Sequence, residues 1–202
     1  MNFKQKLTAI AAVACMSSVF AATPAEHKAA KDQISADYKA AKAQCDTLSG
    51  NAKDVCEKEA KGREKVAEAE LEYRADASER NRHNIAKAKA DAEYDVAKEK
   101  CDDLKGNAKD VCEKDAKAAH VKATEAAKMN TSGNVGPMGN AGTAAMPAAT
   151  QRGTTTAPEA RRDASQEKVR EAEYKAARER CDALSGDVKD KCVADAKRIH
   201  GQ

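Results

Sequence analysis

The chain has 202 residues, of which 34% are charged and 41% are hydrophobic, but the hydrophobic share is mostly Ala and there is no Trp. Burial yields roughly 25 cal/mol per Å² of apolar surface, so a chain this poor in large apolar side chains cannot build a big core. The formal net charge is only +3 and the two signs are evenly mixed, which argues against a nucleic-acid partner and against a membrane-surface helix. The composition instead favours long solvated helices.

Residues 1–21 have the order of a secretory signal peptide. Lys4 and Lys6 precede an apolar stretch, and Val19-Phe20-Ala21 forms a small-x-small cleavage site before Ala22. Loss of the two lysines lowers the formal net charge to +1. No later segment approaches the roughly 20 apolar residues of a membrane-spanning helix, so we expect no transmembrane segment after signal removal.

Two alternatives to signal cleavage remain open. Ala12-Val13-Ala14-Cys15 loosely resembles a lipobox, which would leave the protein lipid-anchored through Cys15. The apolar stretch is too short to span a bilayer, but an uncleaved anchor or a buried helix is the other interpretation. We expect a periplasmic location, with the lipid anchor as its alternative.

An internal repeat is the most informative feature of the sequence. Its pattern is Y-x2-A-x3-C-D-x-L-x-G-[ND]-x-K-D-x-C-x3-A-K, and it occurs three times without a gap, in Tyr38–Lys61, Tyr94–Lys117 and Tyr174–Lys197. Each copy reads as a helix, a tight turn and a second helix. One continuous helix that tolerates a glycine is the alternative.

Helix signals surround the glycine of each copy. In the first copy an apolar stripe leads to the turn, through Ile34, Tyr38, Ala41, Cys45 and Leu48. We expect the glycine to end this helix in a left-handed conformation. The residue after it is the predicted N-cap of the next helix, which applies to Asn51, Asn107 and Asp187.

Six cysteines remain after signal removal, one pair in each copy. An even number in an exported, core-poor chain predicts disulfides. Eleven residues of continuous helix rise about 16.5 Å, whereas the Cα atoms of a disulfide lie within roughly 7 Å, so a bond within a copy requires the hairpin. The predicted pairs are Cys45–Cys56, Cys101–Cys112 and Cys181–Cys192. Each closed loop would add roughly 3 kcal/mol to stability.

The predicted fold class is therefore all-α, with disulfide-stapled helical hairpins, long exposed helices and a disordered linker. Residues 62–93 are expected to form one long exposed helix. Residues 129–160, rich in Pro and Gly, are expected to be a flexible linker that separates the third copy from the first two. The domains are then the signal peptide 1–21, a helical region 22–128 with two copies, the linker, and the third copy in 161–202.

No catalytic motif is present in the sequence. It lacks a Gly-rich phosphate loop, H-E-x-x-H, G-x-S-x-G and the C-x-x-C of thiol oxidoreductases. A zinc site would need closer Cys pairs or nearby His. His120 and His200 do occupy equivalent places, but the first copy has Glu64 there. We expect no enzyme, no catalytic residue, no cofactor and no metal site.

The segments Cys45–Cys56 and Cys181–Asp187 resemble a group of small exported, Ala/Lys-rich cysteine-repeat proteins of Gram-negative bacteria, often labelled TolA-like. A more distant resemblance is to the PsiF repeat of phosphate starvation, in which two cysteines also flank an L-x-G-[DN] turn, at a longer spacing. The resemblance supports export, and neither comparison implies an activity.

The predicted function is that of a non-enzymatic structural or adaptor protein of the cell envelope, which presents helical hairpins to another envelope protein. The alternative function is a periplasmic metal- or redox-buffering protein that uses its cysteine pairs as thiols.

Overall fold

The computed structural model describes residues 23–131 and 157–202, and this part of the chain forms six α-helices and no strand. The all-α prediction is confirmed. The predicted signal peptide and Cys15 lie outside the described residues, as do residues 132–156 of the predicted linker. The helices are α1 (Pro24–Cys45), α2 (Asn51–Ala75), α3 (Glu79–Cys101), α4 (Asn107–Thr131), α5 (Ala157–Cys181) and α6 (Gly186–His200).

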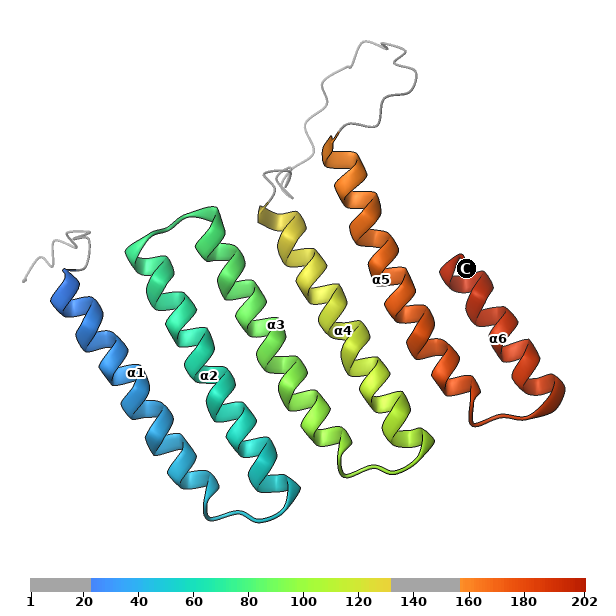
Figure 1. The fold of residues 1–202 in the computed structure, drawn as a ribbon, viewed down its shortest axis with the longest axis horizontal. Helices are drawn as coiled ribbons and strands as arrows, with labels where there is room; N and C mark the ends of the chain where they lie inside the picture. Colours follow the sequence, from blue (N-terminus) through green and yellow to red (C-terminus); the bar gives the residue numbers. More distant parts are fainter. Residues whose placement is uncertain (1–22, 132–156) are drawn as a thin grey trace, which may run out of the picture.

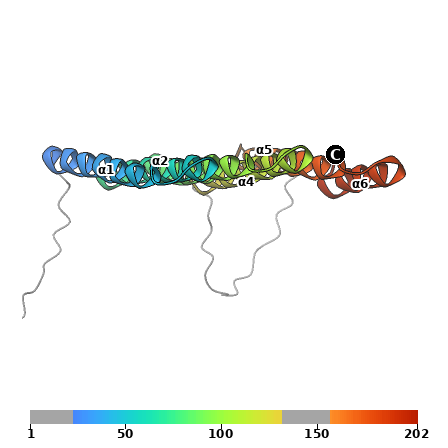
Figure 2. The same cartoon turned by 90° about the horizontal axis from the view of Figure 1, so that it is seen from below.

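The six helices lie side by side in chain order and alternate in direction (Figure 1). Figure 2 shows that the array is a single layer, one helix thick. Within the described residues each helix packs only against its neighbours in the chain. Both broad faces of every helix are therefore open, as in repeat proteins that stack one supersecondary unit on the next. Every described helix is too short or too polar to span a bilayer.

Side-chain caps define where two of the helices begin. Thr23 and Glu26 form a capping box at the start of α1, with Pro24 in the first turn. The Ser78 side chain accepts a hydrogen bond from the backbone N–H of Asn81 at the start of α3. These caps satisfy backbone donors that a helix leaves unpaired at its first turn.

The prediction of one long helix over residues 62–93 is wrong. The helix ends at Ala75, and a new one begins at Glu79 after a short turn. Asn81 stabilises that turn, because its side-chain amide donates to the backbone oxygen of Asp76 at 2.8 Å. The chain therefore reverses here too, and the two halves of the segment belong to α2 and α3.

The turn of each repeat is a tight reversal, as predicted, but the glycine has a different place in it. Gly50 has a positive φ of 57°, yet α1 already ends at Cys45 and Gly50 is the N-cap of α2. Asn51 and Asn107, predicted as caps, are the first helical residues, and α6 begins after Ser185. The positive φ of this glycine is needed to enter the second helix rather than to leave the first.

The leucine of each repeat is part of the turn and not of the buried stripe. Leu48, Leu104 and Leu184 are 44%, 40% and 40% exposed. The backbone N–H of Leu48 donates to the carbonyl of Cys45, which holds the leucine just beyond the helix end. The predicted stripe therefore stops at Cys45.

The core is as thin as the composition predicts. Among the described residues the buried apolar side chains are those of seven alanines, three cysteines and Leu71. Cys45, Cys101 and Cys181 are completely buried. Alanines and half-cystines let helices approach closely while contributing little apolar area, so the disulfides supply much of the constraint.

The third hairpin is not separated from the first two. Both ends of the predicted linker are helical, because α4 continues to Thr131 and α5 begins at Ala157, and α5 packs against α4. In the aligned repeats Thr131 is the equivalent of Ala75. Residues 132–156 thus connect the second hairpin to the third, at the position where only three residues, 76–78, connect the first hairpin to the second.

Candidate interaction surface

Three disulfides staple the hairpins α1/α2, α3/α4 and α5/α6, with the pairing that the spacing predicts. The Cα atoms of Cys45 and Cys56 lie 5.5 Å apart. The corresponding distances are 5.6 Å for Cys101–Cys112 and 5.7 Å for Cys181–Cys192. Both sulfur atoms of each pair are used in the disulfide, and the first cysteine of each pair is fully buried.

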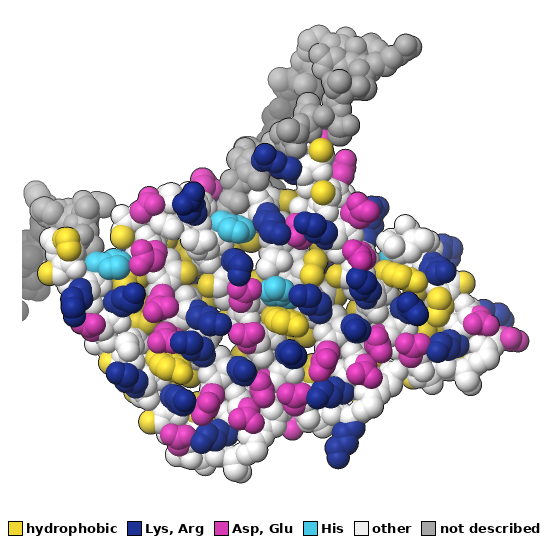
Figure 3. Space-filling model, viewed as in Figure 1, with side chains coloured by type: hydrophobic (Ala, Val, Ile, Leu, Met, Phe, Trp, Pro, Cys, Tyr) yellow, Lys and Arg dark blue, Asp and Glu magenta, His cyan; other side chains and the backbone are white. Residues whose placement is uncertain are grey.

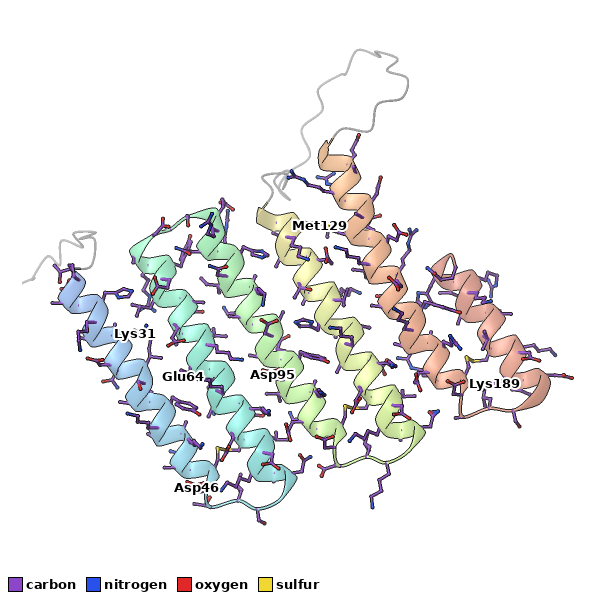
Figure 4. The ribbon with its side chains drawn as sticks, viewed as in Figure 1. Lys31, Asp46, Glu64, Asp95, Met129 and Lys189 are labelled. Carbon is purple, nitrogen blue, oxygen red and sulfur yellow. A yellow bond between two sulfur atoms is a disulfide. The ribbon has the colours of Figure 1, made fainter. Side chains whose placement is uncertain are left out.

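An ion pair spans the turn of every hairpin. The carboxylate of Asp102 lies 2.6 Å from Nζ of Lys109. Asp46–Lys53 and Asp182–Lys189 repeat the contact, both at 2.8 Å, and Figure 4 labels Asp46 and Lys189 at their turns. The hydrogen bond from Lys109 lowers the pKa of the Asp102 carboxyl, and the same cause lowers the pKa of Asp46 and Asp182.

Both residues of this ion pair belong to the repeat pattern, but the sequence analysis did not predict that they pair. The aspartate that follows the first cysteine and the lysine seven positions later recur in all three copies. Equal spacing across a tight turn was the signal that could have identified the pair.

In each hairpin a histidine of one helix lies beside a carboxylate of the other. Nε2 of His120 lies 2.7 Å from the Asp91 carboxylate, and its ring packs on Tyr94 with centroids 4.8 Å apart. Burial raises the pKa of Asp91, but hydrogen bonds from Lys87 and His120 outweigh it, so the net shift is downward. His200, the repeat equivalent of His120, lies 3.9 Å from Glu173 of α5, and His27 of α1 lies 3.4 Å from Glu72 of α2.

These contacts bear on the metal-buffering alternative. His120 and His200 are each paired with a carboxylate, and Glu64 of the first hairpin pairs with Lys61 at 2.6 Å. Within the described ranges, no three His, Cys, Asp or Glu side chains gather as a metal site would require.

The junctions between hairpins, α2/α3 and α4/α5, are structural equivalents. Lys100 pairs with Glu59 across the first at 3.7 Å, and Arg180 pairs with Asp115 across the second at 2.5 Å. At the first junction the helices approach so closely that a Cβ built on Gly62 would lie 2.7 Å from the Cβ of Ala92. Sequence reasoning missed both junctions.

The α4/α5 junction also buries a charge. Glu125 is 4% exposed and accepts hydrogen bonds from Ser165 at 2.8 Å and from Lys128 at 2.7 Å. Lys168 of α5 lies 3.7 Å from the same carboxylate. Burial raises the pKa of Glu125, but the bonds from Lys128 and Ser165 outweigh it, so the carboxylate is stabilised as an anion.

One broad face of the array contains grooves between neighbouring helices. The groove between α2 and α3 has a volume of about 450 Å³. A second groove, of about 340 Å³, lies between α1 and α2 and shares Arg63 and Ala67 with the first, so both open on the same side. The α2/α3 groove is lined by Glu59, Gly62, Arg63, Val66, Ala67, Glu70, Lys89, Ala92, Glu93 and Val96.

The space-filling view shows one broad face on which Lys and Arg side chains alternate with Asp and Glu over all the helices, with small hydrophobic patches between them (Figure 3). Such a mixed surface has neither the basic patch of a nucleic-acid site nor a wide apolar area. No protein-family model, curated protein or solved structure matches this chain.

Proposed function

We propose that this chain is a non-enzymatic protein of the bacterial cell envelope that acts as a structural or adaptor protein for another envelope protein. The observation that carries the proposal is the single layer of helices (Figure 2). In a one-layer array a large fraction of each helix surface is exposed, and repeat proteins use such surfaces to bind partners. The disulfides hold the two helices of each hairpin together, so the surface is maintained without a large core.

The periplasm is the proposed compartment. Three disulfides in a chain with so thin a core are compatible with an oxidising compartment, because disulfides persist in secreted and periplasmic proteins and are rare in the cytosol. The predicted signal peptide supports the same location. Lipid anchoring through Cys15 is the alternative for membrane attachment.

The ionisation of the described residues supports a binding role over catalysis. Asp46 and Asp102, whose carboxyl pKa values are lowered, belong to ion pairs at exposed turns. Catalytic groups are more often found as perturbed pairs that share a cleft. Here the charged groups hold turns and helix neighbours together.

Site-specific photocrosslinking in the envelope tests the proposal. A photoreactive residue at Val66, which lines the α2/α3 groove, is compared with one at Glu68. Two positions along a helix differ by about 200° in direction, so the two residues sample opposite sides of α2. We expect one discrete adduct with another envelope protein from one of these faces, reproduced with the purified partner.

Thiol counting on the native protein separates the proposal from metal or redox buffering. The adaptor proposal requires that the six repeat cysteines resist alkylation until a reductant is added. Absence of any specific adduct, together with reactive thiols in the native protein, would favour the buffering alternative.

A further inference from the structure

The groove between α2 and α3 has an apolar floor with closed ends. Gly62, Val66, Ala67, Ala92 and Val96 line it, and none of the five is fully exposed. Ion pairs cross the groove at both ends, Glu59–Lys100 at 3.7 Å and Glu70–Lys89 at 3.1 Å. Residues 59 and 70 are eleven positions apart on α2, which makes the trough about 16 Å long.

Two charged residues on opposite banks have no ion pair. Arg63 on α2 and Glu93 on α3 are exposed and line the groove, but neither forms a salt bridge within the described residues. The charges at the two ends of the trough are all paired. A partner that lies over the trough can therefore offer a carboxylate to the α2 bank and a cation to the α3 bank.

The register of the two helices makes this groove complementary to itself. The contact of Gly62 with Ala92 sets the antiparallel register, in which Arg63 on α2 and Glu93 on α3 lie about two residues apart along the groove. A second copy related by a two-fold axis along the groove places its α3 over α2 of the first. Gly62 of one copy then faces Ala92 of the other, and Arg63 faces the bank that carries Glu93 of the other copy.

We propose that a second copy of this chain occupies the α2/α3 groove and forms a two-fold symmetric dimer. Arg63 and Glu93 differ by about two residues, or about 3 Å, along the groove, which an arginine side chain spans easily. The interface is isologous, so every favourable contact occurs twice.

The flat array leaves this face open along its length (Figure 2). Helices of 23 and 25 residues are about 35 Å long. Two such helices side by side offer about 600 Å² per copy, which places the dimer at the lower end of specific interfaces.

The equivalent groove at α4/α5 lacks these features. Ala119 replaces Arg63, Lys122 replaces Val66 and Ala176 replaces Val96, and Glu173 is already paired with Lys122 at 3.5 Å. The α4/α5 groove therefore offers neither the valines nor the free charge of opposite sign. The proposal is confined to α2 and α3.

Sedimentation velocity on the full oxidised chain, at micromolar to submillimolar concentrations, tests the dimer. Arg63→Glu and Glu93→Arg each replace two attractive contacts with two repulsive ones, so each should raise the dissociation constant about tenfold. The double variant Arg63→Glu/Glu93→Arg restores both contacts and should return the constant close to its original value. Lys31→Glu, an exposed change on α1, is the control and should have no effect.

Helicity measured by circular dichroism confirms that each variant is folded, and a photoreactive residue at Val66 should give a crosslinked homodimer. A monomer at every concentration would overturn the proposal, as would a dimer that ignores both charge reversals or a double variant that fails to recover. Whether another envelope protein binds the chain is a separate outcome.

Discussion

Arg180 of α5 lies 2.5 Å from Asp115 of α4, and this ion pair ties the third hairpin to the second. It repeats the contact between Lys100 and Glu59 at the previous junction. The third repeat is therefore continuous with the array even though a long insertion precedes it in the chain.

This junction predicts the behaviour of a nicked protein. Arg152 is the tryptic site in the segment that the sequence predicts to be a linker, and we expect limited trypsin to cut there first. The two fragments should then elute together in size-exclusion chromatography, because α4 and α5 remain packed. Arg180→Glu should weaken this association, whereas Arg170→Glu, an exposed control on the same helix, should not. Early cutting within a hairpin would contradict the prediction.

Gly62→Leu should loosen the α2/α3 junction. A side chain at this position meets Ala92 at a distance that real Cβ atoms do not tolerate, so the helices must move apart. Overpacking of this kind costs about 2 kcal/mol, measured as the loss of unfolding free energy in denaturant. Ala52→Leu, at an exposed position of the same helix, is the control. Equal stability of the two variants would show that the close approach is not needed.

Removal of the third disulfide should release α6 before any other helix. α6 has 15 residues and packs only against α5, so the bond contributes about 3 kcal/mol with little else to hold the helix. In Cys181→Ser/Cys192→Ser, hydrogen exchange should accelerate across α6.

Cys101→Ser/Cys112→Ser is the matched comparison, because α3 and α4 each have two neighbours and should lose less protection. A tryptic map of the oxidised protein should show linked peptides for each pair, since Lys53, Lys109 and Lys189 lie between the cysteines. Links between different hairpins would refute the pairing.

The Asp102 carboxyl should titrate below the ordinary Asp value of about 3.9, because Lys109 donates a hydrogen bond to its charged form. A lowered folded-state pKa means that its contribution to stability is present above the unfolded pKa and is lost as the pH falls through the folded value. Lys109→Met should raise the Asp102 pKa in an NMR titration, while Lys114→Met on the same helix should leave it unchanged. An identical titration in both variants would show that the pair does not form in solution.

The mature protein should begin at Ala22. The order of lysines, apolar residues and small residues in 1–21 predicts cleavage there, and the intact mass of protein extracted from the envelope measures it. A mass that corresponds to a diacylglyceryl group on Cys15 would contradict this cleavage and show that the protein is lipid-anchored.

The sequence by itself determined the hairpins and their staples. A disulfide between cysteines eleven residues apart cannot form along one helix, so the repeat spacing of Cys45 and Cys56 required the reversal and left the pairing within each copy as the natural solution. Local signals of this kind act within a few turns of helix and are visible in a single sequence. The thin core also followed from composition alone.

Only the tertiary structure decided how the hairpins assemble. The junctions depend on Gly62 beside Ala92 and on charged pairs such as Asp115–Arg180, and these residue types occur throughout a chain rich in Ala, Lys and Glu. Because each contact is small and chemically common, nothing in the sequence distinguishes the contacting residues from those that face water. The position of α5 on α4, and with it the single open layer, is set by the sum of these weak contacts.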